Sequence, residues 1–389
     1  MVATEFPPNA TGGGPAILRQ MLKGWPGDKL FWWSCLPAFD KSSSIKPALH
    51  IVSTIPSRLY PRQRMARMKA EILTRFWAPR ASEQLSSAIQ RLRPDAVWAI
   101  PHQWSILPLR KILPLAGVPY HVSIHDLADA HHPERTIGLK TTRRFLTAVE
   151  DLYRDAASRD TISREMALDM EQKTGRPADQ ILHAGVEPAD FEYLEGKHGV
   201  SGAPLKIAYA GTIVAVEAFL STVQSLARIR PRLAQGLELH LFGTHSYRSH
   251  SWFEPEWMRE HGDLAAGDLL SRLRGCDWGL SPMDLTDANA RYNRFSLPTK
   301  VVSYLAAGLP MICVGHSAST IARLGRRYSL GIQIEEGDLP EMDALLLRGL
   351  SQNDAWGSRR ADIIRCAREE FDAEAMRRRL YQRLEMSAN

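Results

Sequence analysis

The chain has 389 residues, of which 44% are hydrophobic and 24% are charged, a composition typical of a soluble globular protein. Since a domain usually has about 100–200 residues, this length predicts two domains. The formal net charge is +6, and the segment 58–80, with seven basic residues and one acidic residue, accounts for all of it. The remainder is close to neutral, which argues against a nucleic-acid-binding domain, so we expect no nucleic-acid partner.

The sequence lacks the features of an exported or membrane-spanning protein. Residues 1–15 contain no basic segment followed by an apolar one, as a secretory leader would. The longest uncharged apolar stretch, 301–315, is shorter than the ~20 residues that span a bilayer. The four cysteines are far apart and have neither metal-ligand spacing nor the pattern of a disulfide framework. These features predict a cytoplasmic protein.

The first half of the chain alternates strand-like and helix-like segments. Short apolar runs rich in β-branched and aromatic residues predict strands, and longer runs with apolar residues at helical spacing predict helices. The expected strands are 2–7, 29–36, 48–55, 95–101, 119–126 and 181–188, the expected helices are 15–25, 81–93 and 135–157, and 160–175 is a strand followed by a helix.

A polar, glycine-rich segment at 195–204 is typical of a linker, and the alternation resumes after it. The expected strands are 206–211, 237–243, 277–282, 311–315 and 331–335, and the expected helices are 215–229, 265–274, 297–307 and 317–325. Strands that alternate with helices indicate parallel sheets covered by helices. We therefore predict an α/β protein with two doubly wound, Rossmann-like domains that face each other across a cleft. Their limits are 1–194 and 205–366.

Ligands of doubly wound sheets bind beyond the carboxyl ends of the strands, where loops and helix N-termini gather. This rule brings four loops to the predicted cleft: 12–14, 125–126, 210–212 and 286–300. The glycines at 12–14 would let an anion approach the backbone at a helix N-terminus, although a turn without a ligand has the same sequence. Gly211 ends a strand in the same way, where backbone amides could meet a phosphate.

His125 and Asp126 end a buried strand, which suits a catalytic base or a group that orients a hydroxyl. His131 and His132 follow, so a metal site is an alternative, but the spacing matches no helix-borne site and no cysteine ligand is near. A third interpretation is that His125 only satisfies backbone groups. We expect neither a metal nor a cofactor.

Lys300 lies in the first turn of the expected helix 297–307, where the helix N–H groups disfavour a cation by ~0.3–1 kcal/mol. Arg291 and Arg294 precede it. A bound diphosphate would explain this cluster, because the N–H groups and the lysine converge on one anion. Incidental charge on a solvated loop is the alternative.

The basic segment 58–80 also has Met65, Met68, Ile72 and Phe76 at helical spacing, with arginines on its other faces. It could lie on an anionic membrane surface, where each basic residue contributes about 1 kcal/mol. Alternatively, the two methionines and the isoleucine pack on the sheet and the arginines are solvated.

Together these motifs resemble the glycosyltransferases of the GT-B fold, and most of all the family-four-like group that acts on bacterial surface polysaccharides and glycolipids. The motifs are the glycine loop, "IHDL", "ILHAGVEPADF", "YAGT", "LFG", "GCDWGLSP" and "PTKVVSYLAAGLPMICVG". The resemblance spans most of the chain and is most specific at 276–315. It implies that the C-terminal domain binds the sugar nucleotide, that the N-terminal domain binds the acceptor, and that the last helix, 367–389, crosses back to the N-terminal domain.

The resemblance also implies roles for individual residues. The catalytic or acceptor-orienting candidates are His125 and Asp126, at the strand end where the family places such a residue. The donor-binding candidates, from the glycine loop, the turn after the second domain's first strand and the "PTK" region, are Gly13, Gly14, Gly211, Thr212, Arg294, Ser296, Thr299, Lys300 and Ser303.

The chain departs from the common family pattern, which has two glutamates eight positions apart. Here Phe295 and Ser303 occupy those positions. The arginine and lysine that usually follow the donor-domain glycine are also missing, with Thr212 and Glu217 near where they would fall. These differences leave the stereochemistry of transfer open, and they make Lys300 the expected cation for the leaving diphosphate.

The resemblance implies a metal-independent glycosyltransferase that moves a sugar from a nucleotide diphosphate donor, such as a UDP-sugar, to a hydroxyl of a glycan or lipid-linked acceptor. Its place would be in surface polysaccharide biosynthesis, in the cytoplasm or peripherally on the inner face of the cell membrane. Two alternatives are a sugar-nucleotide epimerase of the same fold and a non-catalytic protein that binds a nucleotide sugar or a partner.

Overall fold

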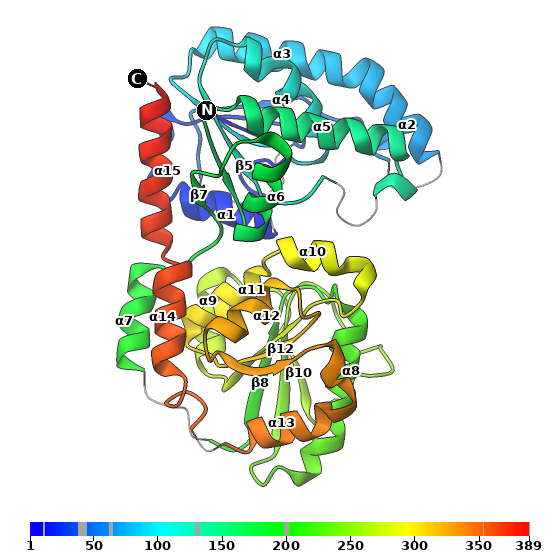
Figure 1. Cartoon of the computed structure of the whole chain (residues 1–389), viewed down its shortest axis with the longest axis vertical. Coiled ribbons are helices and arrows are strands. Elements are labelled where there is room, and N and C mark those ends of the chain that lie inside the picture. The colour runs from blue at the N-terminus through cyan, green and yellow to red at the C-terminus, as the bar shows by residue number, and fades with distance from the viewer. Residues whose placement is uncertain are drawn as a thin grey trace. The chain divides into compact units, whose positions relative to one another are not determined.

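The computed structural model describes residues 1–10, 12–37, 45–61, 65–128, 133–197, 202–352 and 354–388. The chain divides into two compact units (Figure 1). The first unit comprises Met1–Ala184 and Ala375–Asn389, and the second comprises Gly185–Glu374. Each unit is built around a parallel sheet of its own.

The sheet of the first unit has the strand order β3-β2-β1-β4-β5-β6-β7. Its strands are β1 (Val2–Thr4), β2 (Phe31–Ser34), β3 (Leu49–Val52), β4 (Val97–Ile100), β5 (Tyr120–Ile124), β6 (Ser158–Thr161) and β7 (Gln180–Ile181). Ala3 of β1 lies opposite Trp33 of β2 and Ala99 of β4, and the pairings are parallel. The order reverses between β1 and β4, which is the topological switch point where doubly wound sheets bind ligands.

Helices cover both faces of this sheet. They are α1 (Gly13–Met21), α2 (Ala66–Ile72) with a π-helical turn (Leu73–Trp77), α3 (Ala78–Leu92), α4 (Ile106–Ile112), α5 (Leu139–Asp155), α6 (Arg164–Thr174) and, from Ala375 onward, α15 (Ala373–Ala388). Helices α3, α4, α5 and α6 pack side by side in this order. Because crossovers between parallel strands are right-handed, α1 lies on the opposite face.

Tryptophans of the central strands fill the core of the first unit, and each satisfies its indole N–H. Trp33 donates to the hydroxyl of Ser53 (3.0 Å), and Trp98 donates to the hydroxyl of Ser123 (2.7 Å). Both rings are buried. A buried N–H without a partner would cost about 1–3 kcal/mol, so these bonds let large rings pack at the centre of the sheet.

The sheet of the second unit has the strand order β10-β9-β8-β11-β12-β13. Its strands are β8 (Leu205–Ala210), β9 (Leu237–Phe242), β10 (Met258–Glu260), β11 (Trp278–Pro282), β12 (Met311–Val314) and β13 (Gly331–Ile334). Its helices are α7 (Pro188–Gly196), α8 (Val216–Ile229), α9 (Ala266–Arg274), α10 (Ala290–Phe295), α11 (Thr299–Ala307), α12 (Thr320–Arg327), α13 (Met342–Leu350) and α14 (Arg360–Glu370). The switch point lies between β8 and β11.

Short 3₁₀ turns complete both units. They are Gly27–Lys29, Ser57–Leu59, Gln103–Ser105, Leu113–Leu115, Pro133–Arg135, Arg230–Arg232, Asp287–Asn289 and Glu336–Glu341.

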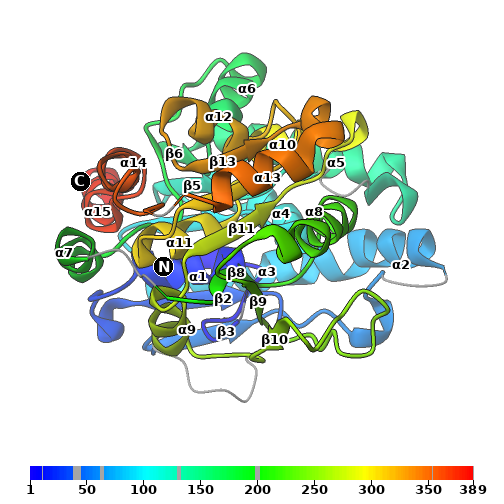
Figure 2. The ribbon, with the colours of Figure 1, turned by 90° about the horizontal axis from the view of Figure 1, so that it is seen from below.

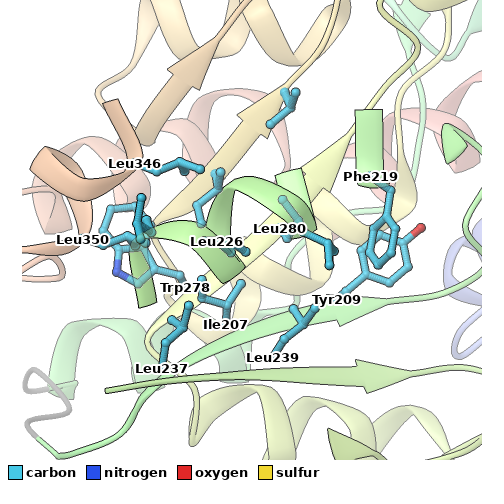
Figure 3. Packing of buried hydrophobic residues seen from close by; sticks show 14 of the residues in the cluster. Ile207, Tyr209, Phe219, Leu226, Leu237, Leu239, Trp278, Leu280, Leu346 and Leu350 are labelled. Atoms are coloured by element: carbon cyan, nitrogen blue, oxygen red, sulfur yellow. The ribbon is translucent and has the colours of Figure 1, made fainter. Parts of the chain in front are cut away.

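The core of the second unit lies between its sheet and the helices α8 and α13, which pack side by side (Figure 2). Ile207 and Leu239 of the strands belong to one buried cluster with Leu226 of α8 and Leu346 of α13 (Figure 3). Burying each of these side chains contributes about 1.5–3 kcal/mol. Apolar side chains fill this face of the sheet, so we expect the polar groups that could bind a ligand at its carboxyl edge.

Tyr304 of α11 joins the two strands at the second switch point. Its hydroxyl accepts a hydrogen bond from the amide of Ala210 (3.0 Å) and lies 3.0 Å from the carbonyl of Leu280, to which it donates. A Cβ on Gly279 would lie 2.5 Å from the Tyr304 ring, so the ring fits only over a glycine. These contacts fix the middle of α11 against the end of β8 and the centre of β11.

Lys197 fixes the other end of α11. Its Nζ donates to the carbonyls of Ala307 (2.9 Å) and Gly308 (2.8 Å), the last residue of the helix and the glycine that follows it. A cation at a helix C-terminus is favourable because it meets the negative end of the helix dipole. Removal from water nevertheless lowers the pKa of Lys197 to about 8.

The predicted fold class is confirmed, since both units are doubly wound α/β structures with parallel sheets. The limits of the units differ from the predicted ones: the first unit ends at Ala184 rather than at 194. Residues 195 and 196 of the expected linker are the end of α7, because Pro188 and a Glu187–Asp190 capping box start a helix before them. Residues 198–201 lie outside the described part of the chain.

The last helix also begins at a different point from the predicted 367–389. Residues 367–370 are the end of α14, which groups with the second unit. The chain passes to the first unit at Ala375, inside α15.

The segment 58–80 exposes three large apolar side chains and buries others. Leu73 and Trp77 are buried, whereas Met65, Met68 and Phe76 are 63%, 48% and 64% exposed. The alternative that the two methionines pack on the sheet is therefore wrong. Arg62 and Arg64 of this segment lie outside the described residues.

Candidate functional site

Polar side chains gather at the carboxyl edge of the first sheet, around its switch point. Glu5 follows β1, His102 follows β4, and His125 and Asp126 follow β5. The strands β1, β4 and β5 are neighbours in the sheet, so their carboxyl ends meet in one place.

His102 lies between two carboxylates. Its Nδ1 is 3.3 Å from Oε2 of Glu5, and its Nε2 is 3.8 Å from Oδ2 of Asp126. Burial opposes the charged form, but the hydrogen bond to Glu5 and the two negative charges outweigh it and raise the pKa of His102 above its ordinary value. The hydroxyl of Tyr60 lies 3.0 Å from Oε1 of Glu5 and holds that carboxylate from its other side. The arrangement favours a protonated His102 beside Asp126.

His125 is buried, and neither of its ring nitrogens has a hydrogen-bond partner among the described residues. Burial lowers the pKa of His125 to about 4, so the ring is neutral at neutral pH. An unpaired buried polar group costs about 1–3 kcal/mol, and a ligand that paired with it would recover that free energy. A neutral imidazole can donate from one nitrogen and accept at the other.

The glycine loop lies against this histidine. Gly12 precedes α1 with a φ of 110°, a conformation that residues with a side chain rarely adopt, and Gly13 is the first residue of the helix. A Cβ on Gly14 would lie 4.0 Å from Nδ1 of His125. The structure thus brings Gly14 and His125 together at a helix N-terminus, where free N–H groups favour an anion.

In the second unit, the turn after β8 forms one side of the equivalent edge. Gly211 has a φ of 98°, and its amide donates to the carbonyl of Phe242 (2.7 Å). The hydroxyl of Tyr209 donates to the carbonyl of Thr212 (2.7 Å), which holds the turn beside the tyrosine ring. Gly211 and Thr212 are both exposed at this edge.

Lys300 forms the other side of this edge, as the second residue of α11. Its Nζ lies 4.0 Å from the centroid of the Tyr209 ring, a favourable contact between a cation and a π face. No carboxylate pairs with it within the described part of the chain, and removal from water lowers the pKa of Lys300 to about 7. Lys300 is thus a partly buried cation without a counter-ion at a helix N-terminus. Such a position stabilises an anion.

The remaining donor-binding candidates are placed around α11. Thr299 is exposed at its first position, and Ser303 is partly buried one turn after Lys300. The carbonyl of Ser296 accepts a hydrogen bond from the hydroxyl of Thr320. Arg294 is exposed on α10, with its guanidinium 5.7 Å from the ring centroid of the adjacent phenylalanine, residue 295.

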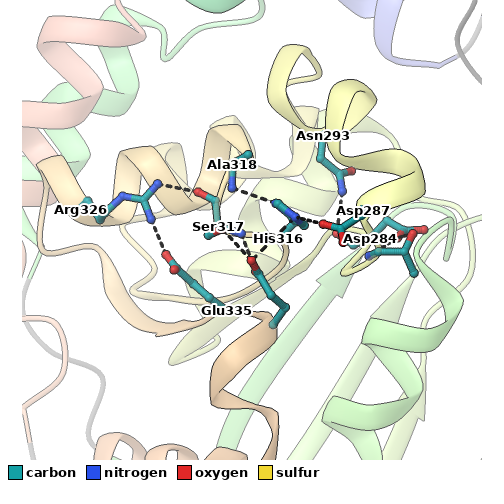
Figure 4. Close-up of polar contacts among 10 residues, drawn as sticks. Asp284, Asp287, Asn293, His316, Ser317, Ala318, Arg326 and Glu335 are labelled. Carbon is teal, nitrogen blue, oxygen red and sulfur yellow. Dashed lines mark hydrogen bonds and ion pairs between the residues drawn. The ribbon is translucent and has the colours of Figure 1, made fainter.

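A polar network that the sequence analysis did not single out ties together the loops after β11, β12 and β13 (Figure 4). Nδ1 of His316 accepts from the amide of Ala318 (3.0 Å), so Nε2 carries the proton and donates to Asp287 (3.0 Å). Arg326 contacts Glu335 and the carbonyl of Ser317 (2.5 Å each). The network holds the loop that leads into α10 and α11.

Glu5 and His102 were also missed from the sequence, although each follows an expected strand. Their pairing depends on β1 and β4 being neighbours, which the strand order reveals and the motifs do not. His131 and His132, the alternative metal ligands, lie outside the described residues. Among the residues that the structure describes, no group of three or more His, Cys, Asp or Glu side chains could hold a metal ion.

No helix of the described chain is both long enough and apolar enough to cross a bilayer. The two strand-edge sites belong to separate units, and their meeting in one cleft remains a prediction.

Residues 209–354 match the family model described as Glucosyltransferase 3-like, C-terminal domain. The match includes Tyr209, Gly211, Lys300 and His316. No curated protein matches the chain.

Solved structures match over nearly the whole chain. One is the E. coli trehalose-6-phosphate structure bound with UDP-2-fluoro glucose, with 14% identity, a TM-score of 0.63 and 98% of each chain covered. Another is the UDP-forming α,α-trehalose-phosphate synthase of Burkholderia xenovorans in complex with glucose-6-phosphate, with 13% identity, a TM-score of 0.62 and 99% of each chain covered. A third is sucrose-phosphate synthase of Thermosynechococcus elongatus, with 13% identity, a TM-score of 0.66, and 100% of this chain and 96% of that chain covered.

At these identities the structural matches establish the fold, and the family model adds a match within the second unit. The predicted recognition of a GT-B glycosyltransferase is confirmed. Residues 209–354 are thus similar to the Glucosyltransferase 3-like C-terminal domain, in a chain that has the fold of the GT-B glycosyltransferases.

Proposed function

We propose that the chain transfers a sugar from a nucleotide diphosphate sugar to a hydroxyl of a glycan or lipid-linked acceptor in surface polysaccharide biosynthesis. A UDP-sugar is the expected donor, because one matched structure is bound with UDP-2-fluoro glucose and another is UDP-forming. The observation that carries the proposal is Lys300, a cation without a counter-ion at the second switch point.

Lys300 is suited to the diphosphate of the donor. In the transition state the leaving diphosphate gains negative charge, and a cation and helix N–H groups aimed at it lower the barrier. The first turn of α11 supplies the N–H groups, and the exposed Gly211 turn lets the backbone approach the ligand. Because Lys300 supplies positive charge at this point, we propose that the reaction needs no resident metal.

The edge of the first sheet suits the acceptor. Asp126 is 48% exposed at its side chain and can accept a hydrogen bond from an acceptor hydroxyl, or take its proton in an inverting reaction. His125 offers two unpaired ring nitrogens to the same ligands. His102, held by Glu5, would place positive charge beside Asp126.

Calorimetry with UDP tests the donor site. Lys300→Ala should weaken UDP binding severely, whereas Arg348→Ala, which removes an exposed charge from α13, should leave it unchanged. Unchanged affinity in Lys300→Ala would refute the role in binding phosphate. Asp126→Asn and His125→Ala should retain UDP affinity and lose transfer.

The same proteins separate the alternatives. Conversion of a nucleotide sugar incubated without any acceptor would indicate an epimerase. Binding of donors without turnover across a panel of acceptors would indicate a non-catalytic protein.

We propose further that the segment 58–80 makes peripheral contact with an anionic membrane on the cytoplasmic side. Met65, Met68 and Phe76 are exposed beside basic residues such as Lys69 and Arg75, which is the composition of a surface that lies in a lipid headgroup layer.

A further inference from the structure

A groove lies between α3, α4 and α5 on the first unit. It consists of two adjoining hollows of about 320 and 550 Å³. Both are lined by Leu107, Lys111 and Arg144, so they form one continuous depression. We call it the basic groove, because its lining has six cations and two carboxylates: Arg75, Arg110, Lys111, Lys140, Arg143, Arg144, Glu71 and Asp151.

The carboxylates do not neutralise the groove. Glu71 lies 3.6 Å from Arg75, and Asp151 lies 3.0 Å from Arg110. The four other cations have no hydrogen-bond or ion-pair partner among the described residues; they are Lys111, Lys140, Arg143 and Arg144. An excess of four positive charges in one depression calls for an anionic ligand with several charges.

The position of three of these cations strengthens this conclusion. Lys140, Arg143 and Arg144 lie in the first two turns of α5, whose first turn contains no acidic residue. Lys140, in the first turn, faces the positive end of the helix dipole, which is unfavourable for a cation, and the two arginines add like charge beside it. A phosphate in the groove would offset both the dipole and the mutual repulsion of the side chains.

Large apolar side chains flank the groove. Leu115, in the lining, is 83% exposed, and Leu139, next to Lys140, is 54% exposed. A Cβ on Gly138 would lie 3.6 Å from Cγ of Arg67, so α2 adjoins the start of α5 (Figure 1). The exposed face of α2 thus continues the apolar margin.

We propose that the basic groove binds the phosphate headgroups of anionic lipids, while Leu115 and Leu139 enter the layer beneath them. Charge alone would suit any phosphate, but a soluble phosphate gains nothing from leucines held in water, whereas a lipid surface buries them. The proposal extends the membrane contact proposed for the segment 58–80 to a second, headgroup-binding surface, and it does not depend on the chemistry of the sugar transfer.

Co-sedimentation of the full chain with vesicles tests the proposal. The vesicles are pure phosphatidylcholine, or phosphatidylcholine with about one third phosphatidylglycerol. We expect binding only to the anionic vesicles. Each basic residue changes partitioning about fivefold, so a groove variant without three charges should bind about 100-fold more weakly. That variant combines Lys111→Gln, Lys140→Gln and Arg144→Gln.

A control variant removes three exposed charges that lie outside the groove and have no partner among the described residues: Lys29→Gln, Arg164→Gln and Arg348→Gln. It has the same net charge as the groove variant and should bind vesicles far more tightly. Leu115→Ser should weaken binding without changing the net charge. Equal loss in the control and groove variants would overturn the proposal.

Two further outcomes also decide the matter. If Met68→Ser with Phe76→Ser abolishes vesicle binding and the groove variant binds normally, only the segment 58–80 contacts lipid and the groove proposal fails. If inorganic phosphate, at the phosphate concentration of the vesicles, displaces the chain completely, the groove is a site for soluble phosphate and the proposal also fails. UDP affinity should be unchanged in every one of these variants, which keeps this test separate from that of the donor site.

Discussion

The protonation of Lys300 should make nucleotide binding depend on pH. In the free chain its pKa is about 7, because it lacks a counter-ion and is withdrawn from water. A bound diphosphate favours the charged form of Lys300 and raises its pKa toward the ordinary value. At any pH between the pKa of the free chain and that of the bound chain, binding is therefore accompanied by uptake of a proton. About half of the free chains carry the charge at pH 7 and about 1% at pH 9, so UDP affinity should fall about 50-fold, or ~2.3 kcal/mol, over that interval.

Two substitutions isolate this effect. Lys300→Arg keeps a charge at every pH in this range, so its UDP affinity should be nearly constant between pH 7 and 9. Lys300→Ala should bind UDP weakly at both pH values, and its affinity should not change between them. Calorimetry in two buffers of different ionisation enthalpy should detect uptake of up to one proton at pH 8 by the wild-type chain alone. If Lys300→Ala retains the slope of the wild-type chain, another group titrates and the reasoning about Lys300 is wrong.

Three other predictions concern stability and the first unit. The pKa of Lys300 is lower in the folded than in the unfolded chain, so the ligand-free chain should become more stable as pH rises from 7 to 10. Lys300→Met should raise the Tm at pH 7 and abolish the increase of stability with pH. Gly279→Ala should lower the Tm by an amount equivalent to about 1–3 kcal/mol, because the new Cβ meets the Tyr304 ring; an unchanged Tm would show that α11 can shift freely. Glu5→Gln should lower the pKa of His102, which NMR titration of its ring protons would follow. Because the pKa of His102 is raised in the folded chain, it adds stability at pH values below the pKa of the unfolded chain, and the substitution should reduce that gain. An unchanged pKa would mean that Asp126 alone raises it.

The sheets were predictable because their strands are nearly all buried. A strand buried on both faces is a continuous apolar run, and such runs mark most strands of both sheets. Strand β10 (Met258–Glu260) escaped prediction because "MRE" is short and polar at the edge of its sheet. Helix α4 escaped because its sequence, "ILPLRKI", has a proline inside it, which ordinarily argues against a helix.

Of the candidate site, the residues in local motifs could be predicted. The loops with Gly14, His125, Gly211 and Lys300 lie at strand ends or helix starts, where a single stretch of sequence shows both the residue and its setting. Within each unit, the proximity of its two loops could be expected from the general rule for doubly wound sheets. The roles assigned to them remain predictions.

The pairs between distant segments could not be predicted. Glu5 and His102 are far apart in sequence, and their contact depends on which strands are neighbours. The missing counter-ion of Lys300 was equally hidden, because only the fold shows that no carboxylate of the described residues pairs with it. The exposure of Met65 and Met68 depends on which side of α2 faces the sheet. The spacing of the apolar residues in that helix is compatible with burial of either side.

The division of the chain has a consequence for the order in which it can fold during synthesis. The second unit is continuous, but the first is completed by residues 375–388 of α15, which are synthesised only after the whole second unit. This helix buries Met376, Leu380 and Leu384, and the hydroxyl of Tyr381 donates to the carbonyl of Met21 (2.8 Å). A nascent chain must therefore hold its N-terminal unit with an uncovered apolar strip until the second unit has been synthesised, which makes the N-terminal unit the one most in need of a chaperone.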